Sequence, residues 1–204
     1  LCDRLQYDLL FKWFLDVNIM DAAFDASSFS NNKERLLEHQ VAREFLGAVV
    51  AQARRQKLLS EDHFTVDGTL LEACASLKSF RPKDGDNGTS ATDGKNPSVN
   101  FHGERRTNDT HQSTTDPEAR LARKGGGKEA RLCFTGHVLM ENRNGMVVDV
   151  TFTQATGTAE RDAALNMLEG VPGSRRVTVG ADKGYDSLDF VTMCRRMNIT
   201  PHVA

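Results

Sequence analysis

Two aspartates in this chain of 204 residues follow short apolar stretches of the kind that form strands. Asp67 follows Phe64–Val66 in the run FTVDGTLL, and Asp182 follows Val177–Ala181 in the run VTVGADKGYD. Carboxylates at the ends of two strands can hold the divalent metal ions that assist phosphoryl transfer. Each Asp-Gly or Asp-Lys-Gly step is also a common turn sequence, so the two motifs alone leave both interpretations open.

Both segments resemble, in the same order, the bacterial insertion-sequence transposases of the DDE superfamily. The resemblance covers nearly the whole chain and includes LQYDLLFKWF, LEACASLKSFRPKDG, RRTNDTHQSTTDPEARLARKGGGKEARLCFTGHVLMENRNG and QATGTAERDAALNMLEGVPGSRRVTVGADKGYDS. In that family the first catalytic acid lies in a VDGT-like motif and the second in an ADKGYD-like motif. The resemblance therefore implies that Asp67 and Asp182 are catalytic and bind Mg²⁺ or Mn²⁺.

The apolar pattern predicts an α/β fold in which a mixed sheet is flanked by helices. Strands are expected at 64–66, 131–140, 146–153 and 177–179, with a turn at Asp67-Gly68 and a hairpin at Asn144-Gly145. Helices are expected after Thr158 and after Ser187, with Thr158 and Asp186 as capping residues. The resemblance implies the RNase H-like form of this sheet, in which the first and fourth strands are neighbours and bring Asp67 beside Asp182.

The domain prediction is an N-terminal helical region at 1–60 and a partial RNase H-like catalytic domain at 61–204. Apolar residues recur at helical spacing in 1–14 and 37–53, with Ser30 as a plausible N-cap. This layout fits either a helix-turn-helix that reads DNA or the edge of a helical bundle, with Trp13 as a core anchor. Residues 81–116 hold very few apolar side chains, so a disordered loop is predicted there.

The charge distribution offers a modest indication of DNA binding. The formal net charge is only −2, but residues 117–131 hold five basic and two acidic side chains. We predict that Lys124, Lys128 and Arg131 contact DNA phosphates, together with Lys183 next to Asp182. Lys183 can equally be a solvated surface lysine.

Other motifs narrow the possible functions further. The run GGGK at 125–128 is read as a flexible turn, because Glu129 stands where a phosphate-binding loop needs Ser or Thr. The four cysteines are isolated from one another and are predicted to be reduced thiols. No apolar run reaches the roughly 18 residues of a membrane span. A cytoplasmic protein is therefore expected, and the resemblance implies a bacterial, nucleoid-associated one.

The resemblance implies metal-dependent DNA strand cleavage and strand transfer at transposon ends. Its partners would be terminal inverted repeats and target DNA, with a homo-oligomer on DNA as the working unit. The alternatives are a non-catalytic DNA-binding remnant of a mobile element and an unrelated RNase H-like nuclease, which would lack the long matches.

The family's third acid, a glutamate on a late helix, has no match before Ala204, and the chain does not begin with methionine. An internal fragment that is inactive by itself is therefore expected. If the fragment nevertheless cleaved DNA, another carboxylate would have to supply the third ligand, with Asp149 and Glu160 as the two candidates.

Overall fold

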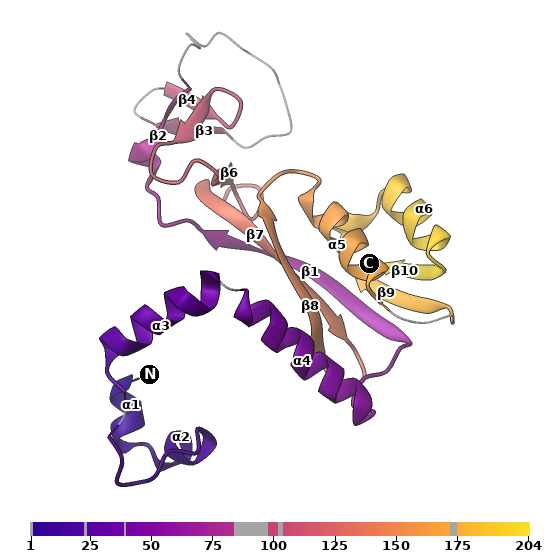
Figure 1. The fold of residues 1–204 in the computed structure, drawn as a ribbon. Helices are drawn as coiled ribbons and strands as arrows, with labels where there is room; N and C mark the ends of the chain where they lie inside the picture. Colours follow the sequence, from indigo (N-terminus) through magenta and orange to yellow (C-terminus); the bar gives the residue numbers. More distant parts are fainter. Residues whose placement is uncertain (1, 23, 39, 84–97, 102–103, 172–174) are drawn as a thin grey trace. The chain divides into compact units, whose positions relative to one another are not determined.

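The computed structural model describes residues 2–22, 24–38, 40–83, 98–101, 104–171 and 175–204, in two compact units (Figure 1). The first unit, Leu1–Gln52, contains α1 (Cys2–Tyr7), α2 (Leu9–Phe14), α3 (Ala26–Glu38) and most of α4 (Val41–Arg55). The second unit, Ala53–Ala204, contains all the strands. Among the described residues, no helix is long and apolar enough to cross a membrane.

The helices of the first unit begin at other residues than the sequence predicted. Helix α3 begins at Ala26 because the Asp25 side chain accepts a hydrogen bond from the backbone N–H of Ser28 at 2.7 Å. The predicted N-cap, Ser30, lies inside this helix. Helix α4 starts after Gln40, whose φ of 53° interrupts the helical conformation. Trp13 is 77% exposed, so the prediction of a core anchor is wrong in this structure.

The main sheet of the second unit has the predicted mixed topology. Its strands are β1 (His63–Glu72), β6 (Arg120–Ala122), β7 (Arg131–Glu141), β8 (Met146–Gln154), β9 (Val177–Ala181) and β10 (Ile199–Val203). The order is β10-β9-β1-β7-β6, with β8 also paired to β7. Strand β1 runs antiparallel to β7 and parallel to β9. The first and fourth predicted strands are therefore neighbours, as in an RNase H-like core.

Two turn predictions had different outcomes. The hairpin at Asn144-Gly145 is confirmed, since β7 and β8 pair across it and Gly145 has a φ of 67°. The turn at Asp67-Gly68 is wrong, because β1 continues through it to Glu72. Pairing with β7 holds this extension in place, with Asp67 opposite Val138.

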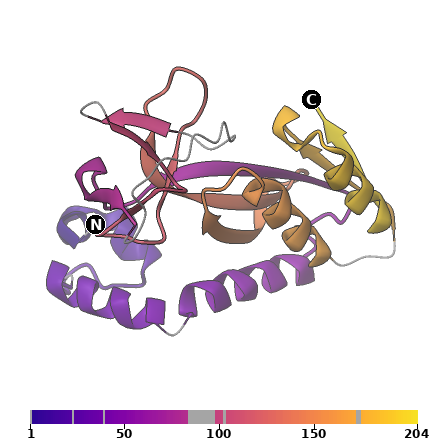
Figure 2. The same ribbon diagram turned by 90° about the horizontal axis from the view of Figure 1, so that it is seen from above.

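Two helices pack on the sheet and bury its apolar face. Helix α5 (Ala159–Glu169) contacts β1, β7 and β8, and α6 (Leu188–Arg196) contacts β10 (Figures 1 and 2). Thr158 precedes α5 but its side chain makes no capping hydrogen bond. Ser187, rather than the predicted Asp186, caps α6 by accepting from Phe190 N. The largest core cluster includes Phe64, Val66, Leu139, Ala164, Leu168, Val179, Tyr185, Phe190 and Ile199.

The segment predicted as a loop at 81–116 contains short strands where the structure describes it. Strand β2 (Phe80–Pro82) follows the short helix η1 (Leu77–Ser79) and pairs with β5 (His111–Ser113), while β3 (Ser98–Phe101) pairs with β4 (Glu104–Thr107). Arg106 donates to the carbonyls of Leu77 and Phe80, and Phe80 is buried in a second apolar cluster. These contacts hold a polar segment in a defined structure, which its amino-acid composition did not predict. The prediction for 84–97 and 102–103 lies outside the described residues.

Candidate active site

Asp67 lies on β1, and Asp182 comes directly after the neighbouring parallel strand β9. In the parallel pairing of β1 with β9, His63 lies opposite Thr178, and Thr65 lies opposite Gly180. Asp67 and Asp182 each follow two residues after the last of these pairs. Asp67 and Asp182 therefore lie at corresponding positions just beyond the paired part of the two strands.

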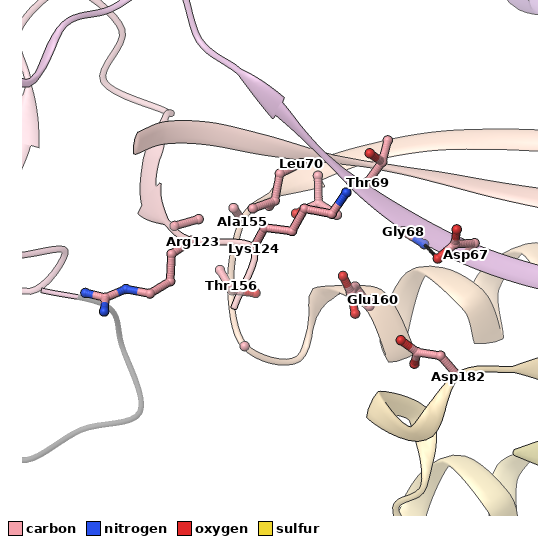
Figure 3. Close-up of a pocket in the computed structure, with 13 residues that line it drawn as sticks. Asp67, Gly68, Thr69, Leu70, Arg123, Lys124, Ala155, Thr156, Glu160 and Asp182 are labelled. Atoms are coloured by element: carbon pink, nitrogen blue, oxygen red, sulfur yellow. Dashed lines mark hydrogen bonds between the residues drawn. The ribbon is translucent and has the colours of Figure 1, made fainter. Parts of the chain in front are cut away.

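Both aspartates line one pocket of about 820 Å³. β1 contributes Asp67 and the residues that follow it, the segment after β6 contributes Arg123 and Lys124, and the start of α5 contributes Glu160. Figure 3 shows the carboxylates of Asp67, Glu160 and Asp182 at one end of the pocket. The full lining is Asp67, Gly68, Thr69, Leu70, Ala122, Arg123, Lys124, Thr135, Ala155, Thr156, Gly157, Glu160 and Asp182.

Backbone N–H groups hold each aspartate in place. Asp67 Oδ1 accepts from the N–H of Gly68 at 2.8 Å, and Asp182 Oδ1 accepts from the N–H of Gly184 at 2.8 Å. Asp182 is thereby the N-cap of a short helix, η2 (Lys183–Tyr185). Among the described residues, the Oδ2 atom of each aspartate makes no hydrogen bond, so one oxygen of each carboxylate remains for another ligand.

The electrostatics of the pocket show that these acids interact. Burial raises the pKa of Glu160 above its ordinary value, and the charges of Asp182 and Asp67 raise it further. Burial also raises the pKa of Tyr185, and Glu160, Asp182 and Asp67 act in the same direction. A concentration of negative charge with a partly desolvated member is costly without a cation, and such clusters are typical of functional sites.

The basic residues divide into two groups. Lys124 lines the pocket and extends toward β1, whereas Arg123 points away from the carboxylates (Figure 3). Lys128, Arg131 and Lys183 are exposed and do not belong to the pocket lining. Hydrogen bonds from Arg131 to Glu72 and Glu129 raise the pKa of Arg131, and both glutamates form ion pairs with it. Of the four residues predicted to contact DNA, only Lys124 therefore lines the pocket, while Lys183 is next to Asp182 in the sequence but outside the pocket lining.

The donor set suits a divalent cation such as Mg²⁺ or Mn²⁺, which prefers carboxylate oxygens and water. Within the described ranges, however, no three His, Cys, Asp or Glu side chains are close enough together to hold a metal ion as they stand. Like charges repel one another, so we expect carboxylates to spread apart without a cation. The three acids share one pocket, and their carboxylate oxygens are the kind of ligand that such a cation prefers.

Comparison with known proteins identifies the family. A family model described as the transposase DDE domain matches residues 59–204, so the chain belongs to the DDE transposase family. No curated protein matches the sequence significantly.

Similar solved structures include piggyBac transposase in a synaptic complex with hairpin DNA. That match has 11% identity and a TM-score of 0.37, and it covers 69% of this chain and 22% of the other. The Mos1 transposase paired-end complex with the left transposon end matches at 14% identity and a TM-score of 0.32, and the match covers 98% of this chain and 56% of the other. A simian T-cell lymphotropic virus intasome matches at 12% identity and a TM-score of 0.35, and the match covers 72% of this chain and 33% of the other. The chain therefore spans between 22% and 56% of these relatives' lengths.

Sequence reasoning did not place several pocket residues. It named Glu160 beside Asp149 without a way to choose between them, and a glutamate in the first turn of a helix is favourable in any case. The structure brings Glu160 to the pocket and leaves Asp149 on β8, outside the pocket lining. The available signal was positional, because the helix that begins at Ala159 connects β8 to β9, the strand that leads to Asp182. The pocket threonines could not be identified, since strand threonines are common and carry no motif.

Proposed function

We propose that Asp67 and Asp182 bind a divalent metal ion and that a longer protein containing these residues cleaves and joins DNA strands at transposon ends. The observation that carries this proposal is that both aspartates, one on β1 and the other directly after β9, line one end of a shared pocket (Figure 3). Membership in the transposase DDE family supports the reaction class. Transposon terminal repeats and target DNA are the proposed substrates, with a homo-oligomer on DNA as the working form.

The residues of the pocket can be assigned parts in this reaction. Asp67 and Asp182 offer the Oδ2 atoms that are not used by the backbone. A bound Mg²⁺ would activate the attacking oxygen and stabilise the leaving oxygen of the phosphodiester. Lys124, which lines the same pocket, is proposed to hold a phosphate as a point charge. Lys128, Arg131 and Lys183 are proposed to contact DNA farther out, and Arg131 would have to exchange its glutamate partners for phosphate.

Nicking of supercoiled plasmid DNA tests the proposal. A longer protein that contains residues 1–204 should nick the plasmid in Mg²⁺ or Mn²⁺, and Asp67→Asn or Asp182→Asn should abolish nicking. Asp186→Asn is the matched control, because Asp186 is exposed and does not line the pocket. Nicking that survives both Asp67→Asn and Asp182→Asn would remove these residues from the site. The expectation that residues 1–204 alone do not cleave DNA stays a prediction.

The second candidate, a non-catalytic DNA-binding remnant, predicts a different pattern. A duplex of arbitrary sequence would bind through phosphate contacts, with an affinity that falls steeply as salt is raised. Asp67→Asn would then leave binding unchanged or strengthen it in all conditions, including Mg²⁺. If Mg²⁺ strengthens duplex binding by the wild type and not by Asp67→Asn, a bridging metal is indicated instead.

A further inference from the structure

Glu160 lies against β1 at the residue that follows Asp67. A Cβ atom built on Gly68 would stand 2.9 Å from Oε1 of Glu160 and 3.0 Å from its Cγ. Real Cβ atoms essentially never come this close, so the glycine at position 68 leaves the space that the Glu160 side chain fills. The glutamate therefore packs directly against the strand that carries the first aspartate.

A second set of contacts ties the start of α5 to the turn that carries Asp182. Arg161 donates to the carbonyl of Gly184 at 3.1 Å and to the carbonyl of Gly157 at 3.3 Å. Gly184 in turn donates its N–H to Asp182. One residue after Glu160, the chain is thus linked to η2, which holds the start of α5 beside the turn that carries Asp182.

An independent observation comes from Tyr185, which is 1% exposed at the end of η2. Among the described residues, its hydroxyl group has no hydrogen-bond partner. The same hydroxyl interacts electrostatically with Glu160, Asp182 and Asp67. A buried hydroxyl without a partner is costly, and this one lies within the field of the three acids. A ligand bound among these acids would bring a polar group that could serve as its partner.

We propose that Glu160 is a third carboxylate ligand of the cation site formed by Asp67 and Asp182. The inference rests on the proposed function, because it requires that the two aspartates bind a metal. It is distinct from the family's downstream glutamate, and it makes cation binding a property of residues 1–204. Asp162 lies in the same first turn of α5, but its side chain is exposed and does not line the pocket. It therefore serves as the comparison for an acid that only occupies the start of a helix.

Mn²⁺ binding to residues 1–204, followed by the electron paramagnetic resonance signal of free Mn²⁺, tests this proposal without any activity assay. Loss of residues that merely support a metal ligand typically weakens binding by about 10- to 100-fold, so loss of a ligand itself should weaken binding at least as much. We therefore expect Glu160→Gln and Asp67→Asn to lower Mn²⁺ affinity at least about tenfold. Asp162→Asn is the matched control for charge and helix position, and it should bind as the wild type does.

The possible outcomes separate this inference from the proposed function. If Asp67→Asn loses affinity while Glu160→Gln binds normally, Glu160 is not a ligand and the two-aspartate site stands. If wild type and Asp67→Asn bind Mn²⁺ equally, or neither binds it, both the site and its third ligand are refuted. Glu160→Asp guards against a folding defect, because it keeps the carboxylate and should retain more affinity than Glu160→Gln. Affinity of Glu160→Asp below that of Glu160→Gln would count against ligation by this side chain.

Discussion

Asp67 on β1 and Asp182 directly after β9 lie at corresponding positions beyond the paired residues of two parallel strands. The pairing of His63 with Thr178 sets this register, and both aspartates lie four residues further along. Between them the chain forms the β7–β8 hairpin and helix α5 before it returns as β9. A parallel return of this kind requires a crossover connection, so the fold itself brings the two carboxylates together.

The first prediction concerns stability in the absence of metal. Burial and then the charges of Asp182 and Asp67 raise the pKa of Glu160, so Glu160→Gln should raise the melting temperature of the metal-free chain. Asp162→Asn should lower it slightly, because that change removes only a favourable charge at the helix start. Differential scanning calorimetry in a chelator measures both. A lower melting temperature for Glu160→Gln would show that this side chain supports the fold rather than a ligand site.

Two glycines are predicted to control the positions of the acids. Gly68→Ala should displace the end of the Glu160 side chain, and Gly184→Ala should displace Asp182, whose Oδ1 would lie 3.0 Å from the new Cβ. Both changes should weaken Mn²⁺ binding and leave the circular dichroism spectrum unchanged. Gly126→Ala is the control, since its Cβ would meet nothing within 4 Å. Normal Mn²⁺ affinity in both variants would mean that these close contacts do not govern the site.

A buried carboxylate away from the pocket gives a pH prediction. Burial alone would raise the pKa of Glu141, but hydrogen bonds from Ser60, Asn144 and Arg143 outweigh it and hold the pKa below its ordinary value. A lowered pKa means that the stabilisation is present above the unfolded-state pKa and is lost as pH falls through the folded-state value. Urea unfolding between about pH 7 and pH 3 should show this loss, and Glu141→Gln should flatten the profile. An unchanged profile would contradict the assignment.

Ser60 allows the same network to be tested at constant pH. Its hydroxyl donates to Glu141, and both residues are buried. Ser60→Ala removes a hydrogen bond to a charged group and should lower the free energy of unfolding by about 2 kcal/mol. Ser27→Ala is the matched control, because the Ser27 hydroxyl also donates to a carboxylate, that of Asp25, but does so at the exposed start of α3. A loss no larger than that of the control would mean that the buried bond contributes little.

Tyr185→Phe separates the packing of the Tyr185 ring from the role of its hydroxyl group. The ring packs edge-on against Phe190 with centroids 5.3 Å apart, and phenylalanine keeps this contact. Because the hydroxyl has no partner among the described residues, its removal should leave the metal-free chain as stable or more stable by about 1 kcal/mol. Mn²⁺ affinity should fall in the same variant. Destabilisation with unchanged Mn²⁺ affinity would assign the hydroxyl a purely structural role.

Much of the sheet could be predicted because its signals are local. Asn144-Gly145 specifies a hairpin, and the apolar stretch before Asp182 specifies a strand, whatever the rest of the chain does. β10 was missed because Pro201 argues against a strand, yet Pro201 lies on the edge strand of the sheet, where proline is tolerated.

The third pocket acid could not be singled out from local signals. The position of Glu160 depends on how α5 packs against β1, where the side chain fills the space beside Gly68, a residue distant in the sequence. A first-turn glutamate looks the same in sequence whether it faces solvent or a pocket. The extension of β1 through Asp67-Gly68 also depends on a contact distant in the sequence, because pairing with β7 overrides a local turn preference.

Iron-directed cleavage of the protein backbone tests most directly whether Asp67 and Asp182 share one cation. Fe²⁺ takes the place of Mg²⁺, and ascorbate with peroxide then generates radicals that cut the main chain close to the bound ion. We predict cuts near Asp67, Glu160 and Asp182 together, which excess Mg²⁺ suppresses and Asp67→Asn abolishes. Cuts confined to one of these segments, or a pattern that Asp67→Asn does not change, would contradict the shared site.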